Sequence, residues 1–142
     1  MEQPSLTLRR HFRAPPSAVW RAFADPALLM RWWGPAGAVN SSAELDTRVG
    51  GRFRVVTRTA DGEEHQVRGL YREVVYPEKL VFTWAWRSTP ERESLVTVTL
   101  SSDGDGTLLT LTHARFFDEE ARDRHRRGWS EALDRMDRVL GE

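Results

Sequence analysis

The sequence contains no cysteine among its 142 residues. This absence excludes a disulfide framework, a thiolate metal site and a cysteine nucleophile. The four histidines show neither the four-residue helical spacing of a metal-binding pair nor any thiolate partner. We therefore expect no metal site and no bound cofactor.

Neither sign of charge dominates, because 21 Lys and Arg residues balance 21 Asp and Glu residues for a formal net charge of +0. That balance argues against a general nucleic-acid binder, which needs a basic face to displace counterions. No apolar run approaches the roughly 20 residues that a membrane span requires. The start lacks the cationic and apolar segments of a signal peptide, so we expect a cytoplasmic protein. The length predicts a single domain over 1–142.

The first third of the chain predicts one strand followed by two short helices. Residues 6–12 alternate between apolar and polar side chains, which indicates a strand. Pro16 suits the first turn of a helix. Asp25 can cap a second helix that begins at Pro26, and Gly34 follows the end of its apolar stripe.

The middle of the chain alternates with the two-residue period of strands, and the breaks are too short for helical crossovers. The alternating segments are 52–58, 67–76, 80–86, 95–100 and 109–113. From Asp118 the period changes, and apolar residues recur at three and four as far as Leu140. These patterns predict an α+β fold: a strand, two short helices, five or six antiparallel strands, and one long C-terminal helix.

One long helix is narrower than a sheet of this width, so a curved sheet around it tends to leave space. The chain has six tryptophans, and several fall on the apolar faces. The residues that we expect to line the space are Trp33, Phe53, Tyr71, Phe82, Trp84, Trp86, Leu111, His113, Trp129 and Leu133. Two interpretations remain open, because these side chains either surround a ligand or fill the core themselves.

Several short motifs, in a specific order, resemble one known family. They are Ala14-Pro15-Pro16-Ser17-Ala18-Val19-Trp20, Trp32-Trp33-Gly34-Pro35, Val49-Gly50-Gly51-Arg52-Phe53, Gly62-Glu63, Pro77-Glu78-Lys79-Leu80-Val81-Phe82-Thr83-Trp84, Thr110-Leu111-Thr112-His113 and Gly128-Trp129. The chain resembles the bacterial proteins similar to the activator of heat-shock-protein ATPase, within the START-like (SRPBCC) superfamily. The resemblance covers residues 6–140 and implies a helix-grip fold with a hydrophobic cavity. It implies no single activity, because the superfamily includes carriers, sensors, cyclases and co-chaperones.

His113 is the titratable residue of most interest, because it shares a strand face with two leucines. It can orient the polar end of a ligand or act as a general base. The alternative is a core histidine bonded to Tyr71 or to a backbone carbonyl. Alternation also places Arg10 and Glu73 inward, where we expect them to pair and join two strands.

Three functions follow from these patterns. The leading hypothesis is a non-enzymatic binding module for a small hydrophobic or aromatic molecule, with no catalytic residue assigned. The second is a co-chaperone-like protein that stimulates a heat-shock ATPase, as the resemblance implies. The third is a cofactor-free cyclase or hydrolase that uses His113. The sequence leaves open whether the protein is a monomer or a homodimer.

Overall fold

The computed structural model describes residues 3–141, and its element order agrees with the predicted one. The elements are β1 (Leu6–Phe12), α1 (Pro16–Ala24), α2 (Pro26–Trp32), β2 (Val39–Leu45), β3 (Arg52–Arg58), β4 (Glu64–Val75), β5 (Lys79–Trp86), β6 (Ser94–Asp103), β7 (Gly106–Ala114) and α3 (Glu119–Leu140).

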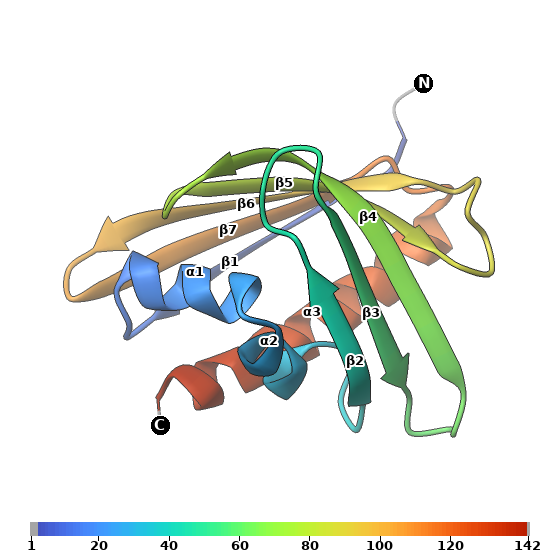
Figure 1. Ribbon diagram of the computed structural model, residues 1–142, viewed down its shortest axis with the longest axis horizontal. Helices are drawn as coiled ribbons and strands as arrows, with labels where there is room; N and C mark the ends of the chain where they lie inside the picture. Colours follow the sequence, from blue (N-terminus) through green and yellow to red (C-terminus); the bar gives the residue numbers. More distant parts are fainter. Residues whose placement is uncertain (1–2, 142) are drawn as a thin grey trace.

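Within these described residues, a seven-stranded sheet has the order β1-β7-β6-β5-β4-β3-β2, and every neighbouring pair is antiparallel. The sheet curls into a half-barrel, and α3 runs along its concave side (Figure 1). The helix α2 contacts both α3 and β2. This is the predicted helix-grip arrangement, because one long helix covers a sheet wider than itself.

The helix boundaries follow from capping chemistry that the sequence made visible. The Asp25 carboxylate accepts a hydrogen bond from the amide of Ala27 at 2.9 Å and so begins α2. The Asp118 carboxylate does the same for the amide of Ala121 at 2.8 Å and begins α3. The predicted apolar stripe of α3 is buried against the sheet, with Leu133 and Met136 wholly inaccessible to solvent.

One strand was not predicted. The strand β2 (Val39–Leu45) has the sequence VNSSAEL, which is too polar to show an apolar alternation. It is an edge strand, and it pairs with β3 through a register shift between Asn40 and Ser42. Its position depends on a side chain, because the Asn40 amide donates to the carbonyls of Met30 and Trp33 at 2.9 and 3.0 Å. Such contacts leave no periodic signal in a sequence.

The interior between the sheet and the helices is largely filled by the protein's own side chains. Leu111, His113 and Leu133 are 0% exposed. Beside Phe53, Tyr71 and Phe82, the remaining void is only about 10 Å³, no more than a water molecule occupies. None of the helices among residues 3–141 combines the length and the apolar character that a membrane crossing needs.

Candidate functional site

An apolar pocket of about 80 Å³ lies between α3 and strands β3 to β5, beside the β3–β4 hairpin. Four tryptophans line it: Trp33, Trp84, Trp86 and Trp129. We call this space the indole pocket. Trp33 follows α2, Trp84 and Trp86 come from the same face of β5, and Trp129 comes from α3. Three segments that are distant in the sequence therefore supply its indole rings.

Trp84 lies at the centre of these rings. Its ring stacks on Trp33 with centroids 5.5 Å apart and planes 30° from parallel. It also contacts Trp129 at 5.3 Å and meets Trp86 edge-to-face at 5.5 Å. Stacked and edge-to-face pairs at these separations stabilise an aromatic cluster beyond the area that they bury. Ring contacts with Trp84 therefore help to fix the positions of the other three indoles of the pocket.

A wider cleft of about 450 Å³ adjoins the indole pocket and shares Trp84, Trp86 and His125 with it. We call it the outer cleft. The connection between β5 and β6 contributes Arg92, and the start of α3 with the segment before it contributes Phe117 and Arg124. The two spaces together form a small apolar chamber with a broader entrance.

Trp33 is held in place by polar contacts to its backbone. The Asn40 amide donates to the Trp33 carbonyl, while the Asn40 carbonyl accepts from the Thr57 hydroxyl at 2.6 Å. The Arg135 guanidinium donates to the carbonyls of Trp33 and Pro35 at 3.1 and 2.9 Å and also contacts that of Gly34. The end of α2 is thereby fixed against β2 and α3.

His113 accepts and donates one hydrogen bond each, entirely within the core. The Trp129 indole N–H donates to its Nδ1 at 3.0 Å, so Nδ1 must be an acceptor. The proton of the neutral imidazole therefore resides on Nε2, which donates to Ser94 Oγ at 2.7 Å. The Ser94 hydroxyl in turn donates to the Trp84 carbonyl at 3.3 Å. Both ring nitrogens of His113 and the hydroxyl of Ser94 therefore have hydrogen-bond partners.

This tautomer decides what His113 can do. The 2.7 Å approach to Ser94 resembles a serine–histidine dyad, but a general base needs an unprotonated Nε2 to take the hydroxyl proton. Here Nε2 is the donor. Burial holds the pKa of His113 well below its usual value, and repulsion from His125 lowers this pKa further. The residue is a neutral structural group in the wall behind the pocket.

A second indole–imidazole pair lies at the pocket itself, and the sequence analysis assigned no role to its histidine. The Trp86 N–H donates to His125 Nε2 at 3.0 Å, and His125 Nδ1 donates to the carbonyl of Ala121 at 2.7 Å. Burial lowers the pKa of His125, and Arg124 lowers it further, although the bond to Ala121 opposes the shift. His125 belongs to the apolar stripe of α3, and that placement was its only sequence signal.

Gly128 is the other residue of the pocket to which the sequence analysis assigned no role beyond its place in the Gly128-Trp129 motif. It lies inside α3, where glycine costs about 1 kcal/mol relative to alanine. A Cβ atom built there meets no heavy atom within 4 Å, and the residue lines the indole pocket. The missing side chain leaves the pocket open. A lone glycine in the middle of a long amphipathic helix is the signal that could have located it.

With this geometry established, comparison with known proteins identifies the family. Residues 13–141 match the family model described as "Activator of Hsp90 ATPase homolog 1-like protein". The chain belongs to this family. None of the curated proteins gives a significant match.

Solved structures of the family share the fold over nearly the full chain. Protein CV1439 from Chromobacterium violaceum is 28% identical with a TM-score of 0.89, covering 97% of both chains. The AHSA1 protein SPO3351 from Silicibacter pomeroyi is 30% identical with a TM-score of 0.87, covering 97% of this chain and 98% of its own. CalU16 from Micromonospora echinospora is 30% identical with a TM-score of 0.74, covering 96% and 75%.

Within this family fold, the predicted lining residues separate into three groups. Trp33, Trp84, Trp86 and Trp129 surround the indole pocket. Phe53, Tyr71 and Phe82 pack on one another farther along the sheet, with ring centroids 5.2 to 6.1 Å apart. Leu111, His113 and Leu133 are core residues without solvent exposure.

Two predicted contacts and one predicted orientation are wrong. His113 bonds to Ser94 and Trp129 and not to Tyr71 or a backbone carbonyl. Arg10 pairs with Asp134 of α3 at 2.6 Å instead of with Glu73. Glu73 is exposed and lies 3.3 Å from Lys79, because a register shift between Tyr71 and Glu73 breaks the alternation that placed it inward.

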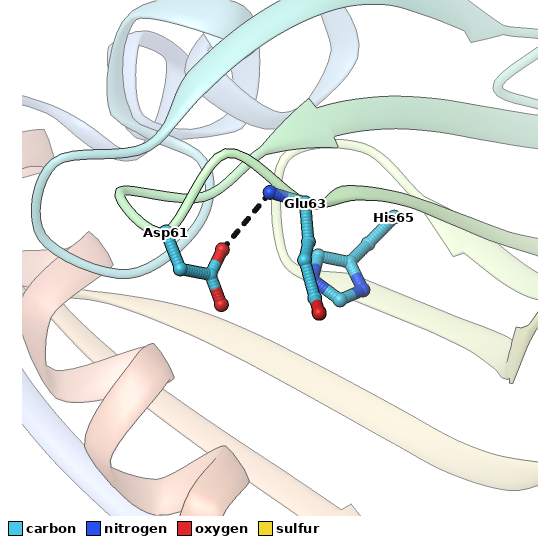
Figure 2. A group of neighbouring side chains, drawn as sticks. All are labelled: Asp61, Glu63 and His65. Carbon is cyan, nitrogen blue, oxygen red and sulfur yellow. Dashed lines mark hydrogen bonds and ion pairs between the residues drawn. The ribbon is translucent and has the colours of Figure 1, made fainter.

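The β3–β4 hairpin beside the pocket brings Asp61, Glu63 and His65 together (Figure 2). Asp61 Oδ1 accepts from the Thr59 hydroxyl at 2.5 Å and from the Glu63 amide at 3.0 Å. These two bonds, the larger effect coming from Thr59, lower the pKa of Asp61. Both bonds close the hairpin turn, so we assign Asp61 a structural role. His65 extends from the hairpin to the wall of the indole pocket.

Proposed function

We propose that this chain is a binding module for a small hydrophobic or aromatic molecule, whose apolar part enters the indole pocket. The observation that carries the proposal is an apolar space of about 80 Å³ walled by four indoles and joined to a 450 Å³ cleft. Such a concave apolar site with few polar groups is typical of small-molecule recognition.

The energetics favour a ligand with at least one ring. Burying about 150 Å² of apolar ligand surface is favourable by roughly 4 kcal/mol before the costs of association, at about 25 cal/mol per Å². The indole N–H groups of Trp86 and Trp129 need no acceptor from the ligand, because they already donate to His125 and His113. Contact area and ring stacking therefore supply the affinity.

Filling the pocket from Gly128 tests the proposal. Gly128→Leu places a side chain into open space lining the pocket, and Gly128→Ala adds one methyl group as the matched control. Both changes improve helix propensity, by about 0.5–1 kcal/mol. Titration of phenyl- and naphthyl-containing ligands, followed by tryptophan fluorescence and calorimetry, should show binding to the parent and to the alanine variant.

The leucine variant should remain folded, with an unfolding midpoint at least equal to that of the parent, and should lose binding. Unchanged affinity in Gly128→Leu would place the ligand elsewhere. The absence of binding across chemically varied ligands would remove the proposal altogether. Because the variant is expected to be at least as stable as the parent, loss of binding cannot be ascribed to unfolding.

The family match supports a second candidate, stimulation of a heat-shock ATPase by this chain. Its test is the steady-state ATPase rate of a bacterial Hsp90-type chaperone with and without saturating protein. A rate increase that survives Gly128→Leu would assign an activity independent of the pocket. An unchanged rate would count against this candidate and leave ligand binding unaffected.

A further inference from the structure

We propose that the ligand of this site is a small aromatic or apolar carboxylic acid, with its ring in the indole pocket and its carboxylate at Arg92. The inference rests on the proposed binding function and adds the chemical class of the ligand. It follows from the charge of the outer cleft, the position of one arginine and the separation of apolar and polar surface along the path into the pocket.

The outer cleft is lined by cations without carboxylates. Among the described residues, the charged side chains that line it are Arg92 and Arg124, and neither Asp nor Glu is among its lining residues. Arg124 pairs with Glu120 of the same helix at 3.0 Å. Two histidines also line the cleft: His125 accepts from an indole N–H, so it is neutral as placed, and His65 lies 3.7 Å from the Glu63 carboxylate, which is not itself a lining residue. The entrance therefore favours an anion over a cation.

Arg92 is the cation available to a ligand. Its guanidinium carbon lies 3.9 Å above the centroid of the Phe117 ring, and no carboxylate among residues 3–141 lies within 4.0 Å of its nitrogens. The stacking holds the planar group at the edge of the cleft and leaves its N–H donors for an acceptor. A carboxylate matches this donor pattern, because two of its oxygens can accept side by side.

The indole pocket, which adjoins the outer cleft, favours an apolar ring at the end of the ligand opposite its carboxylate. Its walls are indole rings, and two of the four indole N–H groups already have imidazole acceptors. The deep wall therefore offers apolar ring faces, and the charged end of the ligand is left to the outer cleft, where Arg92 lies.

A matched ligand series tests the charge. Calorimetric titration would compare phenylacetate, phenylpropionate and phenylbutyrate with their neutral amides and with benzyltrimethylammonium. The best carboxylate should bind about fivefold more tightly than its amide, because an exposed ion pair contributes modestly. The preference should shrink at about 1 M salt, where the screening length is about 3 Å. The comparison of the three acids shows which spacer length best joins a ring in the indole pocket to a carboxylate at Arg92.

Arg92→Gln should abolish the preference for the acid and leave amide affinity unchanged. Arg126→Gln is the control, because Arg126 is an exposed residue of α3 outside the lining of the pocket and cleft and its loss changes net charge equally. Equal binding of acid and amide, tighter binding of the ammonium ligand, or an acid preference that survives Arg92→Gln would each overturn the inference while the binding function stands. If no member of the series binds, the proposed function fails with it.

Discussion

Replacing Trp129 with phenylalanine tests the tautomer of His113, because it removes one hydrogen-bond donor and keeps an aromatic ring in the core. In the folded protein the Trp129 N–H donates to His113 Nδ1, and His113 Nε2 donates to Ser94. His113 is 0% exposed and Trp129 is 5% exposed. The bond between them is therefore shielded from solvent on the histidine side.

The expected loss has two parts. After the substitution His113 retains two ring nitrogens but only one side-chain partner, Ser94, so one buried nitrogen lacks a partner in either tautomer. An unsatisfied buried polar group costs about 1–3 kcal/mol. Exchanging an indole for a phenyl ring removes roughly 1 kcal/mol more of apolar burial. We expect Trp129→Phe to lower the free energy of unfolding by about 2–4 kcal/mol.

Urea denaturation at about pH 7.5 measures this loss, at a pH where histidine is neutral in both states. A double-mutant cycle with His113→Leu isolates the bond, and we expect a coupling of about 1–2 kcal/mol. Nitrogen-detected NMR of the parent should show the imidazole proton of His113 on Nε2. Additive losses in the cycle, or a proton on Nδ1, would refute the assigned tautomer and reopen the case for His113 as a base.

Three further predictions concern stability. Burial lowers the folded-state pKa of His113 and His125. Below the unfolded-state pKa of about 6.5, the unfolded chain therefore binds protons that the folded chain excludes. The free energy of unfolding should then decrease as the pH is lowered, by up to about 1.4 kcal/mol per pH unit for each histidine. Urea midpoints between about pH 7 and 5 should show this slope, and a parent-like slope in His113→Gln would contradict it. Gly69→Ala should cost about 2–3 kcal/mol in thermal unfolding, since its Cβ would lie 1.9 Å from the Thr83 carbonyl oxygen; a neutral effect would show that β4 can move. Asn40→Ala should cost about 2–3 kcal/mol by removing two donors from the end of α2, and Asn40→Asp should not restore them.

Local patterns in the sequence predicted most of the fold, because most elements have an apolar period or a recognisable cap. The strand β2 is the exception, since its sequence VNSSAEL shows no apolar alternation and its place depends on pairing with β3 and on the Asn40 contacts. The register shift after Tyr71 is a second limit. An alternating pattern assigns faces correctly only until an extra residue intervenes, and this is why Glu73 was placed inward.

The candidate site was predicted in its residue types more than in its geometry. Strand alternation placed Trp84 and Trp86 on the face that proves concave, and the helical stripe included His125 and Trp129. Which of these rings meet depends on how α3 lies across the sheet, and spacing along one chain segment does not encode that. The split of the aromatic residues between an open pocket and a filled core is therefore a property of the tertiary packing.

The two histidines satisfy the N–H groups of two of the four tryptophans around the indole pocket. A tryptophan in a pocket wall brings a polar N–H, and an unpaired one would bind water in place of an apolar guest. Here His113 and His125 accept the N–H groups of Trp129 and Trp86. Through its other ring nitrogen, each histidine donates a hydrogen bond to a serine hydroxyl or to a backbone carbonyl. Protonation of either imidazole would convert that acceptor into a donor facing another donor. The pairing of these two indole N–H groups therefore depends on both histidines staying neutral, and we expect it to be lost in the same acid range in which the fold is expected to lose stability.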